Sequence, residues 1–170
     1  SSDMLEVARE KCPENLFINQ DMTDFELYGT VDSILCCLDS VNYITDKRKL
    51  LKMFKLVKNY LNFGGLFIFD INSEYKLKNI IGNNCFVRNE DDLFYSWENE
   101  LLRDKVNFYL TFFVENEEGS FERFDEVHTE RIYKEQEIKL LLKQAGLRLV
   151  DVFYDFKSGK SSKKSERIFF

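Results

Sequence analysis

The stretch VDSILCCL (31–38) decides the fold of this chain of 170 residues. It is an almost continuous apolar run bounded by polar residues, which is typical of a strand covered on both faces, as in a parallel sheet. A second run of this kind, LFIFDIN (66–72), predicts a second buried strand. Between them we expect a helix that begins at Thr45 or Asp46 and ends at NFGG (62–65). Its apolar residues recur at helical spacing: Leu50, Phe54, Val57 and Leu61.

Two further elements precede these strands. Residues 1–12 predict an amphipathic helix, which one of the first three residues can cap. Its apolar face is formed by Met4, Leu5, Ala8 and Cys12. The segment NLFINQDM (15–22) predicts a short apolar strand that ends in Asp21. The order helix, strand, strand, helix, strand is typical of an α/β fold with a doubly wound, mostly parallel sheet.

The C-terminal half of the chain has a different pattern. Residues 106–133 predict two antiparallel strands around the turn ENEEGS (115–120), because apolar and polar residues alternate there. The segment KEQEIKLLLKQAG (134–146) predicts a helix that Gly146 ends. Two final antiparallel strands are expected in LRLVDVFYDF (147–156) and SERIFF (165–170). The stretch between them, KSGKSSKK (157–164), is expected to form a polar loop exposed to solvent.

Composition excludes several classes of protein. The chain is acidic, with a formal net charge of −6 and a pI near 5.0, which disfavours a nucleic acid or an anionic membrane as partner. No apolar run approaches the roughly 20 residues that span a bilayer, and no signal peptide is recognisable. The four cysteines form no CxxC pair and have no metal-ligand spacing. We therefore expect a single domain in a reduced, cytoplasmic chain without a metal.

Polar residues follow each of the three predicted strands. In an open α/β sheet, ligands bind outside the carboxyl ends of the strands. That rule selects residues 21–22, 37–40 and 70–72, each of which contains an acid or an amide that can bind a polar ligand. Asp and Asn are also common turn residues and helix caps, so each residue taken singly has a structural alternative.

Four stretches together resemble successive motifs of class I S-adenosylmethionine-dependent methyltransferases: SSDMLEVAREK (1–11), QDMTDFEL (20–27), VDSILCCLDSVNYI (31–44) and LNFGGLFIFDIN (61–72). The similarity extends to the terminal SERIFF. It is strongest to methyltransferases that act on small molecules, a group that includes sugar-amine N-methyltransferases. The resemblance implies a Rossmann-like sheet with strand order 3-2-1-4-5-7-6, within a methyltransferase domain that spans residues 1–170. It also implies S-adenosylmethionine as cofactor, a small-molecule N or O acceptor, and in-line methyl transfer. Residues 85–133 would form an antiparallel insertion that acts as substrate lid.

The resemblance also implies residues that hold the cofactor. Asp21 would accept a hydrogen bond from the adenine amine, and Met22 would pack on the ring. Met4 would line the same pocket, although a place in the hydrophobic core is an equal alternative for it. Cys37 and Leu38 would contact the methionine portion of the cofactor.

Methyl transfer from a sulfonium mainly requires that nucleophile and methyl group are held in line and that water is excluded. A base is needed only where the acceptor must lose a proton. The catalytic candidates are His128, Asp39 and Tyr43. His128 is the only histidine and therefore the first candidate for a general base, yet in this charged strand a structural pairing to Glu126 or Glu130 is the favoured alternative. The candidates for binding the acceptor are Asn42, Asn72, Trp97, Arg131 and Tyr133, and for Trp97 a place in the core is an equal alternative.

The sequence departs from the family pattern at its start. The glycine-rich loop after the first family strand and the acid that ends the second have no counterpart here, because Gly64 and Gly65 precede a strand. We therefore expect the native protein to carry roughly 60 to 80 further N-terminal residues. Without the first two strands, residues 31–38 would form a bare sheet edge that favours pairing with another chain. The alternative is a non-catalytic, methyltransferase-like module that binds a partner. A dehydrogenase would require GxGxxG, which the sequence lacks.

Overall fold

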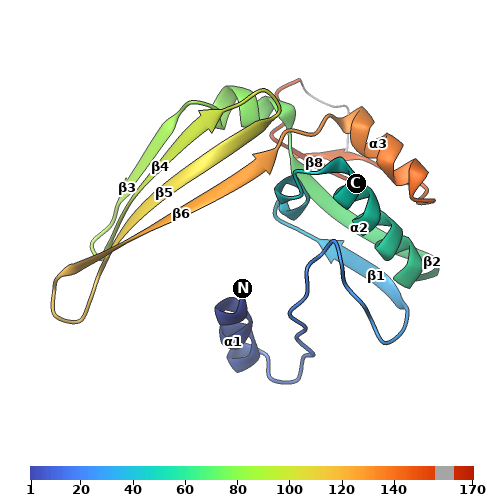
Figure 1. Ribbon diagram of the computed structural model, residues 1–170, viewed down its shortest axis with the longest axis horizontal. Helices are drawn as coiled ribbons and strands as arrows, with labels where there is room; N and C mark the ends of the chain where they lie inside the picture. The colour runs from blue at the N-terminus through green and yellow to red at the C-terminus, as the bar shows by residue number, and fades with distance from the viewer. Residues whose placement is uncertain (156–162) are drawn as a thin grey trace.

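The computed structural model describes residues 1–155 and 163–170, which form two four-stranded sheets (Figure 1). The main sheet has the strand order β1 (Val31–Cys36), β2 (Leu61–Asn72), β8 (Arg167–Phe169) and β7 (Phe153–Tyr154). The outer sheet has the order β3 (Cys85–Asn89), β4 (Leu93–Leu101), β5 (Lys105–Glu115) and β6 (Phe121–Arg131). The helical elements are α1 (Ser2–Lys11), α2 (Lys47–Tyr60), α3 (Glu135–Gln144), the 3₁₀ segment η1 (Ser40–Tyr43) and the π-helical segment η2 (Lys76–Ile81).

The main sheet confirms the predicted α/β class. β1 and β2 run parallel, with Ser33 opposite Leu66, whereas β8 is antiparallel to both β2 and β7. The order β1-β2-β8-β7 reproduces the 4-5-7-6 part of the family strand order. A mostly parallel sheet is not confirmed among the described strands, because only β1 and β2 pair in parallel there. β1 lies at the edge of this sheet, as expected.

Helices α2 and α3 pack on one face of the main sheet. Asp46 caps α2, since its side chain accepts a hydrogen bond from the backbone N–H of Arg48 at 2.7 Å. The predicted apolar face of α2 is buried, and so is that of α3. The cluster formed with the sheet includes Leu50, Phe54, Val57, Phe69, Ile71, Ile138, Leu141 and Ile168. On the other face, Leu35, Leu66 and Ile68 remain exposed, so within residues 1–155 and 163–170 the helices cover one face rather than two.

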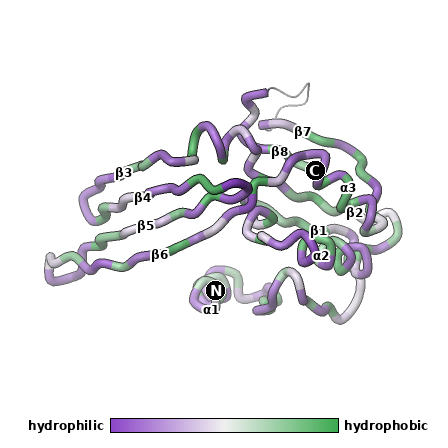
Figure 2. The backbone as a smooth tube through the Cα atoms, turned by 45° about the horizontal axis from the view of Figure 1, so that its top comes forward, coloured by the Kyte–Doolittle hydropathy of each residue, from purple (hydrophilic) through white to green (hydrophobic). Residues whose placement is uncertain are grey.

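The N-terminal segment stands apart from this core (Figures 1 and 2). Helix α1 forms as predicted, with Ser1 accepting a hydrogen bond from the backbone N–H of Met4, but none of its residues is buried. The strand predicted over residues 15–22 is wrong. Leu16 and Ile18 are exposed there, and Asp21 makes only an isolated bridge to Asp24. An apolar segment cannot become a strand without a neighbouring strand to complete its backbone hydrogen bonds.

Helix α2 ends at Tyr60, just before the NFGG segment, as predicted, but NFGG itself already belongs to β2, which begins directly after the helix. Gly64 has a left-handed backbone with φ of 81°. A Cβ at Gly65 would lie 2.7 Å from the backbone oxygen of Asp32. The two glycines therefore allow β1 and β2 to approach closely where their register shifts.

The outer sheet contains the predicted hairpin, since β5 and β6 pair antiparallel around the expected turn. β3 and β4, which were not predicted individually, extend it. The face of β5 that carries Val106 and Phe108 packs against η2 and forms a second core with Leu77, Ile81 and Ile132. The final strand pair is confirmed in β7 and β8, whereas most of the predicted polar loop lies outside the described residues. No helix among the described residues is long and apolar enough to cross a membrane.

Candidate functional site

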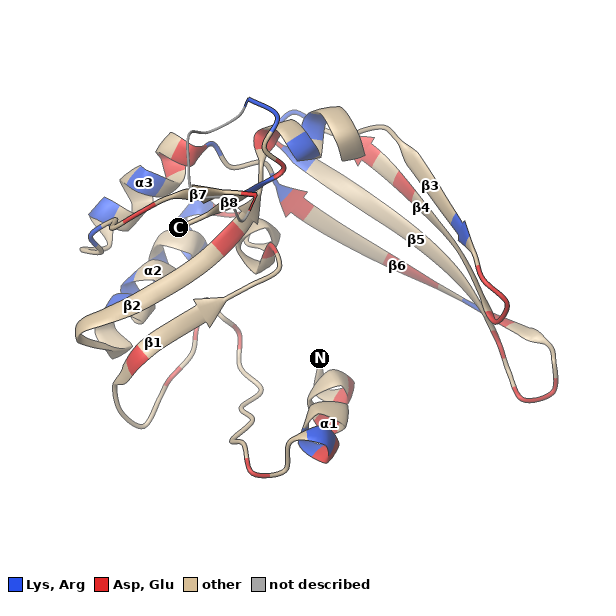
Figure 3. Cartoon of the chain, turned by 180° about the vertical axis from the view of Figure 1, so that it is seen from behind, with Lys and Arg blue, Asp and Glu red and all other residues tan. Residues whose placement is uncertain are grey.

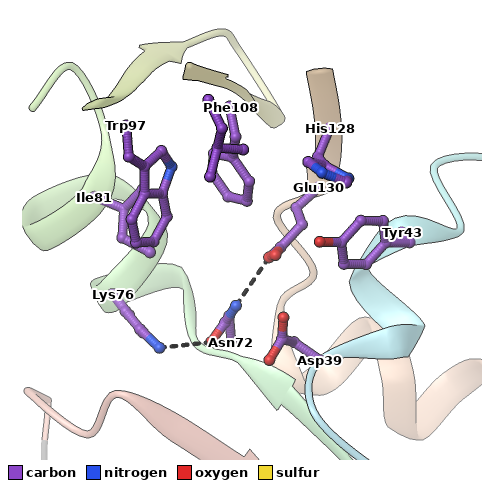
Figure 4. A pocket seen from close by; sticks show the side chains of 10 residues that line it. Asp39, Tyr43, Asn72, Lys76, Ile81, Trp97, Phe108, His128 and Glu130 are labelled. Atoms are coloured by element: carbon purple, nitrogen blue, oxygen red, sulfur yellow. Dashed lines mark hydrogen bonds between the residues drawn. The ribbon is translucent and has the colours of Figure 1, made fainter. Parts of the chain in front are cut away.

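A cavity of about 300 Å³ lies where the carboxyl end of β2 meets the outer sheet (Figure 4). Its walls come from the segment after β1, from β2, from η2 and from the inner face of the outer sheet. The lining residues are Asp39, Tyr43, Asn72, Lys76, Ile81, Trp97, Phe108, Leu110, His128 and Glu130. Five residues predicted from the sequence are brought together here: Asp39, Tyr43, Asn72, Trp97 and His128.

Asn72 organises the polar floor of the cavity. Its side-chain nitrogen donates to Oε2 of Glu130 at 2.9 Å, and its side-chain oxygen accepts from Nζ of Lys76 at 3.0 Å. Its backbone N–H donates to the side-chain oxygen of Asn42 at 3.0 Å. The amide of Asn72 therefore has a fixed orientation, with its nitrogen bound to the carboxyl group of Glu130 and its oxygen bound to the ammonium group of Lys76.

Glu130 is the most deeply buried carboxyl group on this floor, with a relative exposure of 2%. Burial raises its pKa to about 8, against the opposing effect of the hydrogen bond from Asn72. The negative charge of the neighbouring Asp39 raises the pKa further. A buried carboxyl group whose pKa is raised in this way keeps its proton at neutral pH and gives it up when a positive charge lies beside it.

The rim of the cavity carries His128 and Tyr43, whose rings meet edge to face with centroids 5.8 Å apart. Nε2 of His128 lies 3.0 Å from Oε2 of Glu126, the partner that the sequence suggested as one alternative. Burial raises the pKa of the Tyr43 phenol, and the charges of Glu130, Asp39 and Glu126 add to this effect. Tyr43 is therefore a neutral hydroxyl at physiological pH.

The opposite wall is apolar and aromatic. Trp97 and Phe108 meet edge to face with centroids 5.5 Å apart, and Ile81 and Leu110 complete the surface. The indole N–H of Trp97 is buried without a hydrogen-bond partner within the described part of the chain. An unpaired buried donor is costly to the folded state.

The segment after β1 is held by charged groups of the main sheet. Leu38 and Asp39 have left-handed backbone angles, with φ of 58° and 53°. The carboxylate of Asp70 accepts their two backbone N–H groups at 2.8 and 3.0 Å and also binds Arg167. Nη2 of Arg167 donates to Asp39 at 2.8 Å. This network fixes an unfavourable backbone and leaves the side chains of Cys37 and Leu38 exposed.

Three other predicted residues lie outside this cavity and correct the expectation that they face it. Asn42 is fully buried, and its side chain binds the backbone of Asn72 and of Arg131. Arg131 lies on the other face of β6, where it forms an ion pair with Asp104 at 2.9 Å. Tyr133 is fully buried, and its hydroxyl donates to the backbone oxygen of Ile44. These residues connect the two sheets behind the cavity wall.

The residues predicted to hold the cofactor are exposed. Asp21 accepts the backbone N–H and the hydroxyl of Thr23 at 2.7 and 2.8 Å, and these bonds lower its pKa. Met22 is partly exposed, and Met4 is exposed on α1 rather than in the core. Cys36 packs against the main core, and burial raises the pKa of its thiol to about 11, which makes it unreactive.

Sequence reasoning missed half of the lining residues: Lys76, Ile81, Phe108, Leu110 and Glu130. One signal was available, because Phe108 and Leu110 alternate along β5, and Glu130 lies two residues after His128 on the same face of β6. η2 offered no such signal, since its π-helical form is not visible as a sequence period. Among the described residues, no group of three or more His, Cys, Asp or Glu side chains could hold a metal ion.

Comparison with known proteins places this geometry in a family, although no protein-family model matches the chain. A Bacillus subtilis (strain 168) protein named "Putative methyltransferase YqeM" is 32% identical over 176 residues, covering 100% of this chain and 71% of that protein. The crystal structure of an S-adenosylmethionine-dependent methyltransferase from Clostridium acetobutylicum ATCC 824 is 43% identical, with a TM-score of 0.94 over 99% of this chain and 70% of that chain.

A third comparison extends the similarity of fold. The sugar N-methyltransferase KedS8 from Streptoalloteichus sp. ATCC 53650 is 16% identical, with a TM-score of 0.75 over 96% of this chain and 65% of that chain. At this identity the likeness concerns the fold alone, whereas the first two relatives are similar in sequence as well. The chain therefore belongs to the class I S-adenosylmethionine-dependent methyltransferases, and its cofactor is S-adenosylmethionine.

Proposed function

We propose that the cavity binds a small molecule whose nitrogen atom accepts the methyl group. The observation that carries the proposal is the combination of a polar floor, containing Asp39, Asn72 and Glu130, with the aromatic wall of Trp97 and Phe108. Its volume of about 300 Å³ suits a compact molecule rather than a polymer. The sugar N-methyltransferase KedS8, which shares this fold, acts on such a nitrogen. A hydroxyl acceptor is the second candidate.

The exposed residues near Asp21 and after β1 fit parts of the cofactor. The low pKa of Asp21 keeps its carboxylate available as an acceptor for the adenine amine. Met22 and Leu38 offer apolar surface for the ring and for the methionine chain, with Met4 on α1 and Cys37 as further candidates. When bound, S-adenosylmethionine supplies a methyl group activated by a positively charged sulfur.

The residues around the cavity divide the remaining work. The aromatic wall excludes water, and Asn72 orients the polar end of the acceptor. The ring of Tyr43 lies at the rim, where it can stabilise the positive charge of the cofactor sulfur, and His128 lies beside it. Asp39, held by Arg167, contributes a fixed negative charge.

A methyl-transfer assay tests this proposal. The protein is incubated with S-adenosylmethionine and a panel of small primary amines with their matched alcohols, and products are identified by mass spectrometry. We expect methylated amines. Leu110→Trp, which fills the cavity, should abolish the reaction, whereas Val114→Trp, on the same face of β5 outside the cavity, should not. Methylation of alcohols alone, or equal activity of both variants, would contradict the proposal.

A further inference from the structure

We propose that Glu130 binds the positively charged acceptor amine on the floor of the cavity and takes one proton from it. The proposal rests on the proposed function in one respect, because it requires a nitrogen acceptor. It assigns the proton to a residue that differs from His128, the base suggested by the sequence.

The position of Glu130 suits a cation. Its carboxyl group points into the cavity from β6 (Figure 4) and is almost completely buried. Oε2 accepts one hydrogen bond, from Asn72 at 2.9 Å. An ionised carboxylate has about four acceptor sites, so Glu130 can accept further hydrogen bonds from a ligand ammonium. A buried carboxylate of this kind is stable only when a charged or hydrogen-bonding partner compensates it.

The charged groups around Glu130 leave a surplus of negative charge. Three carboxyl groups face this end of the cavity or lie directly behind it: Asp39, Asp70 and Glu130. Arg167 on β8 is shared between Asp39 and Asp70, and Lys76 on η2 binds the amide oxygen of Asn72. With Glu130 ionised, three negative charges face two positive ones, and the titratable rings of Tyr43 and His128 are the other groups on this side. The acidic residues of β6 stand out in Figure 3. A ligand ammonium would balance the charges.

The proton balance includes the proton that Glu130 carries in the free protein near neutral pH: this proton leaves for solvent when the ammonium binds, and the ionised carboxylate then accepts one proton from the amine. One N–H bond of the ammonium breaks, its electron pair stays on nitrogen as the lone pair, and one O–H bond forms on Glu130. An ordinary carboxyl group with a pKa of 4.5 is a poor proton acceptor for an amine with a pKa of about 10, because the transfer is unfavourable by roughly 10⁶. The raised pKa of about 8 reduces that factor to roughly 10². The site therefore has the protonation chemistry that an amine nucleophile needs.

His128 is less suited to this step. It lies on the rim rather than the floor, its side chain is 35% exposed, and Nε2 already faces the Glu126 carboxylate at 3.0 Å. Two residues further along β6, Glu130 forms no ion pair with any residue that the structure describes, and it accepts a hydrogen bond from the neutral amide of Asn72. The two residues therefore have different roles: His128 lines the entrance of the cavity, and Glu130 lies on the floor, where the amine nitrogen would be bound.

Proton release during binding tests the assignment. 2-Phenylethylamine is titrated into the protein, with S-adenosylhomocysteine present, in two buffers of different ionisation enthalpy. Near pH 6.5 the free carboxyl is protonated and the amine is charged. A complex that holds one proton between them must then release close to one proton to solvent. Near pH 9 the free carboxyl is ionised, so the release should fall to about zero. 2-Phenylethanol should release none at either pH.

Two variants complete the experiment. Glu130→Gln should abolish proton release and weaken amine binding at least tenfold, whereas Glu122→Gln, on the same face of β6 outside the cavity, should behave as wild type. Circular dichroism verifies that both variants fold. The wild-type pH series carries the test even if Glu130→Gln is unstable. Amine binding without proton release, or no amine binding, would overturn the assignment. The proposed function fails separately, if the methyl-transfer assay yields no methylated amine.

Discussion

The main sheet and the outer sheet meet at one cavity but are stabilised in different ways. At its carboxyl end the main sheet is stabilised by hydrogen bonds of charged and amide side chains. Asp70 and Asn42 bind backbone groups, and Arg167 binds the carboxylate of Asp39. The inner face of the outer sheet instead carries rings, and one of them, Trp97, has an unpaired N–H. The main sheet therefore fixes the positions of side chains at the cavity through polar contacts, whereas the outer sheet supplies an aromatic wall with fewer polar contacts.

The largest difference should appear when one substitution is made in both sheets. Phe54→Ala removes a fully buried ring from the main core and should lower the free energy of unfolding by about 4 kcal/mol. Phe124→Ala removes a ring from the outer sheet that is 45% exposed, so the loss should stay below about 1 kcal/mol. Urea unfolding measures both values. Equal losses would show that the outer sheet is as tightly packed as the main core.

Asp70→Ala tests the polar network of the main sheet. The substitution leaves two backbone N–H groups and Arg167 without their buried acceptor, and we expect a loss of about 3 kcal/mol. Asp125→Ala on β6, where the carboxylate is exposed, is the matched control and should leave the urea midpoint unchanged. A midpoint of Asp70→Ala close to that of wild type would contradict the idea that charged groups fix this end of the sheet.

The pH dependence of the free energy of unfolding tests whether Glu130, which lies where the two sheets meet, is protonated in the folded protein. Glu130 keeps its proton up to about pH 8 in the folded protein, whereas its ordinary pKa is 4.5. The folded state therefore binds more protons between these values, and its free energy of unfolding falls as pH rises through this window. From about pH 6 to 7.5 we expect a decrease of roughly 1–2 kcal/mol. Glu130→Gln should remove this part of the slope, and Glu122→Gln should keep it.

The smallest effect is expected for Trp97→Phe in the outer sheet. The smaller ring loses some packing, but the substitution also removes an unsatisfied buried donor, and the two effects have opposite signs. We expect the free energy of unfolding to change by less than about 1 kcal/mol, as measured by urea unfolding. A loss well above that value would indicate that the indole is part of a rigid core rather than an adaptable wall.

Much of the fold could be predicted because local signals agree with the final packing. The spacing of Leu50, Phe54 and Val57 specified α2, and Asp46 marked its start. Residues 15–22 carried an equally apolar pattern, yet they form no strand. A segment becomes a strand only when another strand lies beside it and pairs with its backbone, and the apolar pattern of the segment does not say whether such a strand is present.

The site was predictable only in part, for a physical reason. Asp39 and Asn72 could be identified because the carboxyl ends of sheet strands collect ligand-binding residues. For Glu130 the sequence indicated only that it shares a face of β6 with His128, because its burial and raised pKa arise when β6 packs over Asn72. Arg131 was predicted to face the cavity but does not. Side chains alternate along β6, so Arg131 points away from the cavity that the preceding residue, Glu130, faces.

The single tryptophan of this chain lies in the wall of the cavity. Its fluorescence, excited apart from that of the eight tyrosines, therefore reports on one place in the molecule. A ligand that accepts a hydrogen bond from the indole N–H should shift this emission, and one that stacks on the ring should quench it. The protein thus carries its own optical probe, with which unlabelled libraries of small molecules can be screened for the acceptor.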